Sequence, residues 1–426
     1  MRPIAIEKLK YRIVPFIDEN KTRFLFLNRE TRKPSIAISI YETFLSNKFT
    51  SHNTIKQKLR DITYLFSFCE EMNIEIEKIL LSGEIISTAS IRSFSFWLAG
   101  KGRMKEGQNV RMKIASYNSI LNSCSQVACW FVEQYGNFGN GHPLERRMRV
   151  NSSVVAEKKD WNAMTKKSWP MQVAQDLSDE EIKKIDQFLL PRKRDDASLD
   201  NSVSWRNYLI WRLVIEMGLR IGEVLALRLK DCPSHQRSYL RIKRIEERGD
   251  KYHDPRGIYC PRPKTLSRDL GFVFEKSPLP KLINLYATKY RLSDIKTNGH
   301  KTGKKKTPDH DFLIVEHNHG KPLSYSTMGQ IASKIRKNTG IANFHWHIGR
   351  HAFFNRVYLA AANDAESATK LKDLATYGGW SSETSLKIYA ARARRDRARE
   401  GLVSWQQGNI LNWSALNDNS GSGEAT

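Results

Sequence analysis

The sequence predicts a mainly α-helical protein with a small β-sheet in its second half. Apolar residues recur at helical spacing between residues 41 and 140, and again over much of residues 177–400. A stretch from about 238 to 275 is instead rich in residues typical of strands. A chain of 426 residues is long enough for two or three domains. We therefore expect a helical domain followed by an α+β domain.

The first domain is expected to cover residues 41–140. A helix follows the polar residue Ser51, a second covers STASIRSFSFWLAG and ends at Gly100, and a third stops at Gly136. Residues 1–40 alternate weakly between apolar and polar, as in RFLFLNRE, and are expected to form an N-terminal arm that carries strands.

The second domain is expected to cover residues 177–405. It begins with Ser178 and Glu181, which have the spacing of a capping box. Its insert KTNGHKTGKKKTPDH is expected to be a solvated basic loop. The helical periodicity fades over residues 141–176, in the stretch EKKDWNAMTKKSWP, so we expect a basic linker, which either follows a charged partner or is a solvated tether. Residues 406–426 are expected to be a partly disordered tail.

The chain is strongly basic. Lys and Arg number 70 against 45 Asp and Glu, which gives a formal charge of +25 and a pI near 9.8. This surplus favours a polyanionic partner such as nucleic acid, with solubility as the alternative explanation. The five cysteines form no C-x-x-C pair, and no apolar run approaches the ~18 residues of a membrane span. We expect a cytoplasmic, nucleoid-associated protein with reduced thiols.

Two basic residues lie where the helical pattern is interrupted. Arg220 follows the break at Gly218 in EMGLRIGEVLALRLKD, and Glu223 can brace it through a charge-assisted pair, although a purely structural salt bridge is the alternative. Lys264 lies in IYCPRPKTLSRDLGFVF, which we interpret as two strand-like pieces around a turn that contains proline. A lysine at such a tip is either solvated or a mobile proton donor that reaches a phosphate.

The stretch HWHIGRHAFF contains three histidines and an arginine. His347 and Arg350 are three residues apart, so on a helix they point the same way. A metal site of His345, His347 and His351 is the alternative. Against it, Ile348 replaces the Glu of the zinc motif H-E-x-x-H, and a cationic arginine lies between two of the ligands. We therefore expect no metal, and we interpret His351 as a histidine of the core.

Two aromatic residues follow in LATYGGWSSETSLKIYAA. Trp380 comes after two glycines, and Tyr389 lies nine residues later. A half-buried tyrosine at the edge of the core is the ordinary interpretation of Tyr389. Beyond Gly401 the chain is too apolar for a solvated tail, so we expect it to dock on a neighbouring copy or on its own domain.

Together these motifs resemble the catalytic signature of the tyrosine recombinases, the phage integrase family. The matching residues, in order and spacing, are Arg220 in GLRIGE, Lys264 in RPKTLSRDL, His347 and Arg350 in HIGRH, Trp380 in YGGWSS and Tyr389 in TSLKIY. Residues 41–140 are similar in pattern to the family's core-binding domain. Many members have a histidine at the position of Trp380. We interpret the tryptophan as a variant that still positions Tyr389.

The resemblance implies an enzyme that cleaves and rejoins DNA without a cofactor. Tyr389 would attack a phosphodiester to form a 3′-phosphotyrosyl intermediate. Arg220 and Arg350 would neutralise the phosphate oxygens in the transition state. Lys264 would protonate the leaving 5′-oxygen, and His347 would assist proton transfer.

The resemblance also implies partners and an architecture. Glu223 would hold the active-site helices, and the two domains would form a C-shaped clamp around double-stranded DNA. The active assembly would be a homotetramer on paired sites of a mobile genetic element, with possible accessory DNA-bending proteins. The alternatives are a type IB topoisomerase-like nicking-closing enzyme and a catalytically idle DNA-binding regulator. The residues that we expect to bind DNA are Lys158, Lys159, Lys166, Lys167, Arg262 and Arg268.

Overall fold

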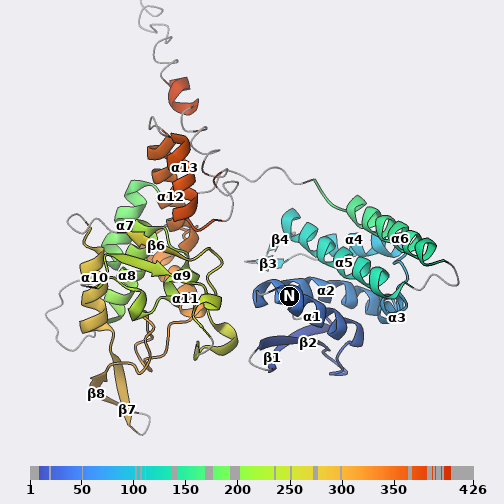
Figure 1. Ribbon diagram of the computed structural model, residues 1–426, viewed down its shortest axis with the longest axis horizontal. Coiled ribbons are helices and arrows are strands. Elements are labelled where there is room, and N and C mark those ends of the chain that lie inside the picture. Colours follow the sequence, from blue (N-terminus) through green and yellow to red (C-terminus); the bar gives the residue numbers. More distant parts are fainter. Residues whose placement is uncertain are drawn as a thin grey trace, which may run out of the picture. The chain divides into compact units, whose positions relative to one another are not determined.

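The chain divides into two compact units, Met1–Pro170 and Met171–Thr426. A computed structural model describes residues 9–18, 21–49, 51–100, 103–105, 108–110, 112–136, 142–167, 176–191, 202–234, 237–249, 252–271, 277–297, 300–362, 367–380, 386, 389, 395 and 398–403 (Figure 1). The start of the predicted arm, part of the predicted linker and the whole predicted tail at 406–426 lie outside the described residues. No helix in the described ranges has the length and hydropathy needed to cross a membrane.

The first unit is a helical bundle with an N-terminal β-hairpin. Strands β1 (Tyr11–Asp18) and β2 (Lys21–Asn28) pair antiparallel. The helices are α1 (Ile36–Lys48), α2 (His52–Glu71), α3 (Ile76–Ser82), α4 (Thr88–Gly100), α5 (Ile114–Tyr135) and α6 (Pro143–Ala163), with a short hairpin of β3 (Arg103–Lys105) and β4 (Gln108–Val110) between α4 and α5.

The β1–β2 hairpin belongs to the core of the first unit, although we predicted a separate arm. Phe24 and Phe26 alternate inward along β2 and are buried. The ring of Phe26 lies 5.0 Å from that of Phe66 on α2. Burial of these rings removes apolar surface from water, so the hairpin is fixed to the bundle by the same force that packs the helices.

Helix α6 corrects the predicted linker, because residues 143–163 are helical. Pro143 occupies the first turn, where its missing N–H costs nothing. Glu157 and Trp161 are the buried residues of the helix; the indole N–H donates to the carboxylate at 2.8 Å, and the backbone N–H of Ile86 donates to the other oxygen at 3.0 Å. The remaining surface is largely polar, which is why the apolar periodicity was too weak to predict a helix.

The second unit is mainly helical. Its helices are α7 (Asp179–Leu189), α8 (Ser202–Met217), α9 (Ile221–Ala226), α10 (Leu279–Leu285), α11 (Tyr325–Thr339), α12 (Trp346–Ala362) and α13 (Ser367–Tyr377). The capping box predicted at the start of α7 is present, with Ser178 accepting from the backbone of Glu181 and the Glu181 carboxylate accepting from that of Ser178. Helix α8 is central, because five consecutive or near-consecutive apolar side chains on it are fully buried: Leu209, Ile210, Trp211, Leu213 and Val214.

The strands of the second unit form two antiparallel hairpins. Strand β5 (Tyr239–Ile242) pairs with β6 (Arg268–Gly271), and β7 (Ser293–Thr297) pairs with β8 (His300–Lys306). The predicted basic loop is therefore the β7–β8 hairpin, which extends away from the helices in Figure 1. The predicted hairpin around Lys264 is wrong, because β6 pairs with β5. Pro261 and Pro263 lack the N–H groups that a strand before Lys264 would need.

Candidate active site

Glu223 is buried at the start of α9, and guanidinium groups gather around it. Its Oε2 accepts the backbone N–H of Arg220 at 2.9 Å, which caps the helix. Its Oε1 lies 3.1 Å from Arg268 Nη1 and 3.8 Å from Arg220 Nη1, and its Oε2 lies 3.9 Å from Arg350 Nη1. Burial alone would raise the pKa of Glu223, but the charges of Arg268 and Arg350 lower it below its usual range. The ionised carboxylate therefore brings three cations together.

Arg350, on α12, is only 1% exposed. Its guanidinium donates to the carbonyl oxygen of Gly218 and, at 2.9 Å, to that of Gly378. The Cζ atom lies 4.5 Å from the ring centroid of Phe354 and 5.0 Å from that of Trp380. Burial and a neighbouring guanidinium lower the pKa of Arg350 to about 9. The group is still cationic at neutral pH, so the site holds a preorganised positive charge.

The turn between α8 and α9 places Arg220 at the edge of this cluster. Gly218 has a φ of +60°, and a Cβ there would meet the ring of Phe353 at 2.4 Å, so the turn requires glycine. The Arg220 side chain is 27% exposed. Its Nη1 is buried and makes no hydrogen bond with any described residue. Because buried donors are nearly always paired, this group is suited to an oxygen of a bound molecule.

Lys264 is exposed, but the two residues after it are anchored to the site. Thr265 donates its hydroxyl to Glu223, and the Leu266 N–H donates to the carbonyl of Gly379 at 3.1 Å. Gly379 has a φ of +66°, and a Cβ there would lie 2.7 Å from Thr265. The close packing of these two turns keeps Lys264 at the rim of the site.

Arg268 has a different place from the one that we predicted. Its side chain is 6% exposed, and it donates to both oxygens of Glu223 and, at 2.6 Å, to the carbonyl of Tyr377. These contacts occupy the guanidinium inside the unit, so the structure does not present it to DNA. Arg262 is half-buried. The other predicted DNA contacts, which belong to the first unit, are exposed: Lys158, Lys159, Lys166 and Lys167.

The histidines of α12 form a row toward Tyr389. His347 and His351 lie edge to face with ring centroids 4.4 Å apart, as their spacing on one helix face requires. Nδ1 of His351 lies 3.2 Å from the hydroxyl of Tyr389. Burial, neighbouring histidines and Arg350 lower the pKa of each ring to about 4. His351 was predicted to be a core residue, and the structure instead places it half-buried against the tyrosine.

Tyr389 is 3% exposed and packs among aromatic rings. Its ring centroid lies 5.7 Å from Trp380 and 5.8 Å from Phe354. Trp380 thus lies against both Tyr389 and Arg350. Burial raises the pKa of the Tyr389 phenol, although the charges of Arg350 and Arg220 oppose the rise. The phenol is therefore neutral at rest and lies within the field of two cations.

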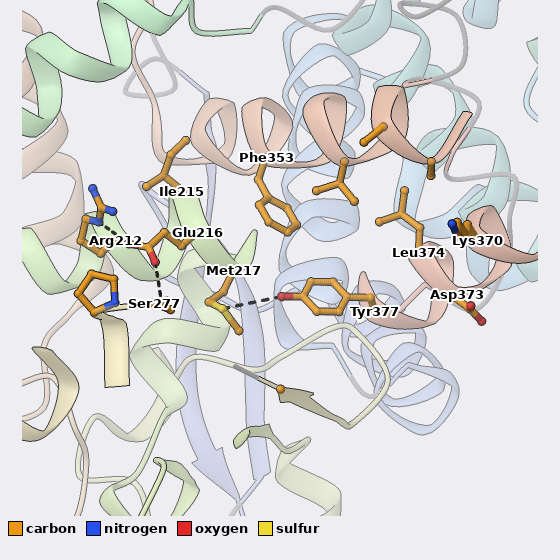
Figure 2. A pocket seen from close by; sticks show the side chains of 15 residues that line it. Arg212, Ile215, Glu216, Met217, Ser277, Phe353, Lys370, Asp373, Leu374 and Tyr377 are labelled. Carbon is orange, nitrogen blue, oxygen red and sulfur yellow. Dashed lines mark hydrogen bonds and ion pairs between the residues drawn. The ribbon is translucent and has the colours of Figure 1, made fainter. Parts of the chain in front are cut away.

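Tyr377 is a second tyrosine beside the cluster, and its hydroxyl points elsewhere. Its hydroxyl contacts the Met217 sulfur at 3.8 Å (Figure 2). Both residues line a groove of about 1040 Å³ formed by the ends of α8, α12 and α13. The pKa of Tyr377 is raised to about 12 by burial. Of these two tyrosines, Tyr389 is the one whose hydroxyl meets the histidine row.

Residues 283–395 match the model of the phage integrase family. This segment contains His347, Arg350, Trp380 and Tyr389, which the structure brings together. This segment of the chain therefore belongs to the phage integrase family, the tyrosine recombinases. Arg220, which lies outside the matched segment, reaches the same cluster through Glu223.

Solved structures of recombinases are similar to this chain at low identity. XerA recombinase is 17% identical, with a TM-score of 0.35, over 86% of this chain and 97% of that one. XerH recombinase bound to palindromic difH substrate is 15% identical, with a TM-score of 0.49, over 87% and 85%. The Tn1549 transposon integrase, in complex with circular intermediate DNA, is 14% identical, with a TM-score of 0.47, over 84% and 98%. No curated protein matches the chain in sequence.

Two contacts of the candidate site were missed by sequence reasoning. The pairing of Arg268 with Glu223 joins residues 45 positions apart, and the contact of His351 with Tyr389 joins residues 38 apart. The second had a usable signal, because His351 is one helical turn after His347 and shares its face. In the described part of the chain, no three His, Cys, Asp or Glu side chains are placed to hold one metal ion.

Proposed function

We propose that the protein is a site-specific integrase or recombinase that cleaves and rejoins DNA through a 3′-phosphotyrosyl intermediate, as part of a mobile genetic element. The proposal rests mainly on the position of Tyr389. Its hydroxyl lies 3.2 Å from Nδ1 of His351, and its ring packs against Trp380, which also contacts the guanidinium of Arg350. A phenol next to an imidazole and two guanidinium groups is suited to attack a phosphate.

Each side chain has one role in a balanced reaction. The Tyr389 phenol gives its proton to a neighbouring imidazole, and its oxygen forms a bond to phosphorus while the bond from phosphorus to the 5′-oxygen breaks. Lys264, at the rim, gives a proton to that leaving oxygen. Arg220 and Arg350 bind the non-bridging oxygens, whose charge grows in the transition state. The Nη1 of Arg220, which makes no hydrogen bond with any described residue, supports this assignment. The phosphotyrosyl ester conserves the energy of the broken bond, so rejoining is the reverse reaction.

His347 and Trp380 have supporting roles in this scheme. His347 keeps part of its ring open to solvent at the edge of the site and would contact the phosphate or relay a proton. Trp380 packs on Arg350 and Tyr389, so it fixes the nucleophile relative to the cation. Glu223 orients the guanidinium groups.

The proposed partner is double-stranded DNA. The formal charge of +25 favours a polyanion, and the four lysines predicted to contact DNA in the first unit are exposed. Exchange of strands needs two cleaved duplexes, so we propose a homotetramer on paired sites, with accessory DNA-bending proteins as possible further components.

Trapping of the covalent adduct tests this proposal. The substrate is a pool of duplexes of randomised sequence, each nicked so that cleavage releases a short fragment and prevents rejoining. The parent should form a protein–DNA adduct that survives a denaturing gel. Tyr389→Phe should form none while it still binds DNA, and Tyr377→Phe should behave as the parent. Adduct formation by Tyr389→Phe would reject the proposed nucleophile. Relaxation of supercoiled DNA without exchange between two selected sites would favour the topoisomerase-like alternative.

A further inference from the structure

The structure places His351, and not His347, in contact with the attacking hydroxyl. Nδ1 of His351 lies 3.2 Å from the oxygen of Tyr389. His347 touches only the edge of the His351 ring, with centroids 4.4 Å apart, and makes no hydrogen bond with Tyr389. Among the described residues, His351 is the one hydrogen-bond partner of the Tyr389 hydroxyl.

The surroundings of His351 determine which proton it can carry. His347 and Arg350 are near it on its own helix, and His345 lies just before that helix. Arg220 approaches from the start of α9 and Asp176 from the segment before α7. Burial is the largest influence and, with the neighbouring positive groups, lowers the pKa of His351 to about 4. A neutral imidazole has one ring nitrogen that accepts a hydrogen bond, and a neutral phenol has one hydrogen to donate. The contact therefore fits a phenol that donates to Nδ1.

We propose that His351 holds the hydroxyl of Tyr389 in place and accepts its proton during the attack on phosphorus. This inference rests on the proposed function, because it assigns the proton acceptor of that reaction. As the bond from the Tyr389 oxygen to phosphorus forms, the phenolic proton moves to Nδ1 of His351. The bond from phosphorus to the 5′-oxygen breaks, and that oxygen takes a proton from the Lys264 ammonium group. Rejoining returns both protons.

The bound phosphate makes this transfer favourable at the moment when it is needed. Without DNA, the cations Arg220 and Arg350 oppose a charged imidazole. A phosphodiester adds negative charge beside them, and the charge on its oxygens increases toward the transition state, so an imidazolium is stabilised there. His351 thus accepts the proton only when substrate occupies the site.

Two substitutions separate the holding of the hydroxyl from the uptake of its proton. His351→Asn keeps an amide oxygen near the position of Nδ1, so it can accept a hydrogen bond but not a proton. His351→Ala removes both functions. The matched control is His345→Ala, at the residue just before α12, because His345 is exposed and has no role in the proposed reaction. Tyr389→Phe serves as the variant without a nucleophile.

The measurement is the single-turnover rate of adduct formation on a nicked duplex selected with the parent, between about pH 7 and pH 9, a range that lies between the ordinary histidine and tyrosine pKa values. We expect His351→Asn to be slower by roughly 100-fold or more, as for loss of a general base. Its rate should rise steeply with pH, because attack then depends on the ionised phenol. The parent and His345→Ala should be fast, with a flat profile over the same range.

Folding and DNA affinity are measured on the same samples, by thermal unfolding and by gel shift. If His351→Asn binds DNA and unfolds like the parent yet keeps the parent's rate and flat profile, the inference is wrong. If His351→Asn slows adduct formation equally at every pH, the claim that His351 accepts the proton is also wrong. A misplaced tyrosine would have that effect, because it slows attack to the same extent across the pH range. These outcomes leave the proposed function intact, which fails instead if the parent forms no adduct or if Tyr389→Phe still forms one.

Discussion

Arg268 and Glu223 form a two-pronged ion pair between β6 and α9. Nη1 of Arg268 lies 3.1 Å from Oε1 of Glu223, and Nη2 lies 3.2 Å from Oε2. Both side chains are buried, and Nε of the arginine also donates to the carbonyl of Tyr377 at the end of α13. The pair therefore joins α9, which begins next to Arg220, to the end of α13, which precedes Trp380. The geometry of the site depends on this connection.

Loss of this pair should destabilise the second unit. Arg268→Ala leaves the buried carboxylate without its main partner, and we expect a loss of about 3–5 kcal/mol in the free energy of unfolding. The matched control is Arg241→Ala on the neighbouring strand, because Arg241 pairs with Asp269 at 2.9 Å on the surface. That substitution should cost less than about 1 kcal/mol. Denaturant unfolding of the two variants checks this, and equal losses would show that the buried pair has no special role.

Arg350→Ala should impair cleavage more than DNA binding. The substitution removes a preorganised cation that stabilises the negative charge developing on the phosphate. The barrier to cleavage should therefore rise by at least ~3 kcal/mol, which slows cleavage more than about 100-fold. Single-turnover adduct formation measures this, and the parent should keep its rate in excess EDTA. Loss of activity in EDTA that zinc restores would instead support the metal site of His345, His347 and His351.

Acid should destabilise the second unit through the two histidines of α12, His347 and His351. His347 and His351 have folded-state pKa values of about 4, below the ordinary value of about 6.5, so the unfolded chain takes up protons first as the pH falls. Their contribution to the free energy of unfolding is fully present above about pH 6.5 and is lost as the pH falls from there toward 4.

Denaturant unfolding at both ends of this pH range checks the effect. His351→Asn should lose less stability on acidification than the parent, because one of the two titrating rings is gone. His319→Asn, at a side chain that is 49% exposed, should follow the parent. An identical acid sensitivity in all three proteins would contradict this assignment.

The apolar segment after Gly401 should couple protomers. Leu402 and Val403 are 53% and 43% exposed, so the described residues leave their apolar surface uncovered. A chain that ends at Gly401 should still bind single DNA sites but fail to assemble paired-site complexes and to recombine. Gel shifts with one-site and two-site duplexes distinguish these outcomes. Recombination by the shortened chain at the parent's rate would show that the segment docks on its own domain or has no coupling role.

The sequence predicted best what depends on local spacing. The capping box of Ser178 and Glu181 and the shared helix face of His347 and Arg350 follow from the period of an α-helix, and the structure confirms these elements. The partner of Arg268 could not be predicted, because a basic residue beside a strand is equally compatible with DNA and with a buried carboxylate. Helix α6 was missed because Glu157 and Trp161 alone are buried along it, so its apolar periodicity is faint.

The most direct test of the account is to identify the residue that carries the DNA. An adduct trapped on a nicked duplex is digested with protease and nuclease, and the nucleotide-bearing peptide is sequenced by mass spectrometry. We predict a phosphate on Tyr389, joined to the 3′ end of the cleaved strand, with a free 5′-hydroxyl on the released fragment that a kinase can label. A phosphate on Tyr377 or on any other residue, or a 5′ linkage to the protein, would contradict the central claim.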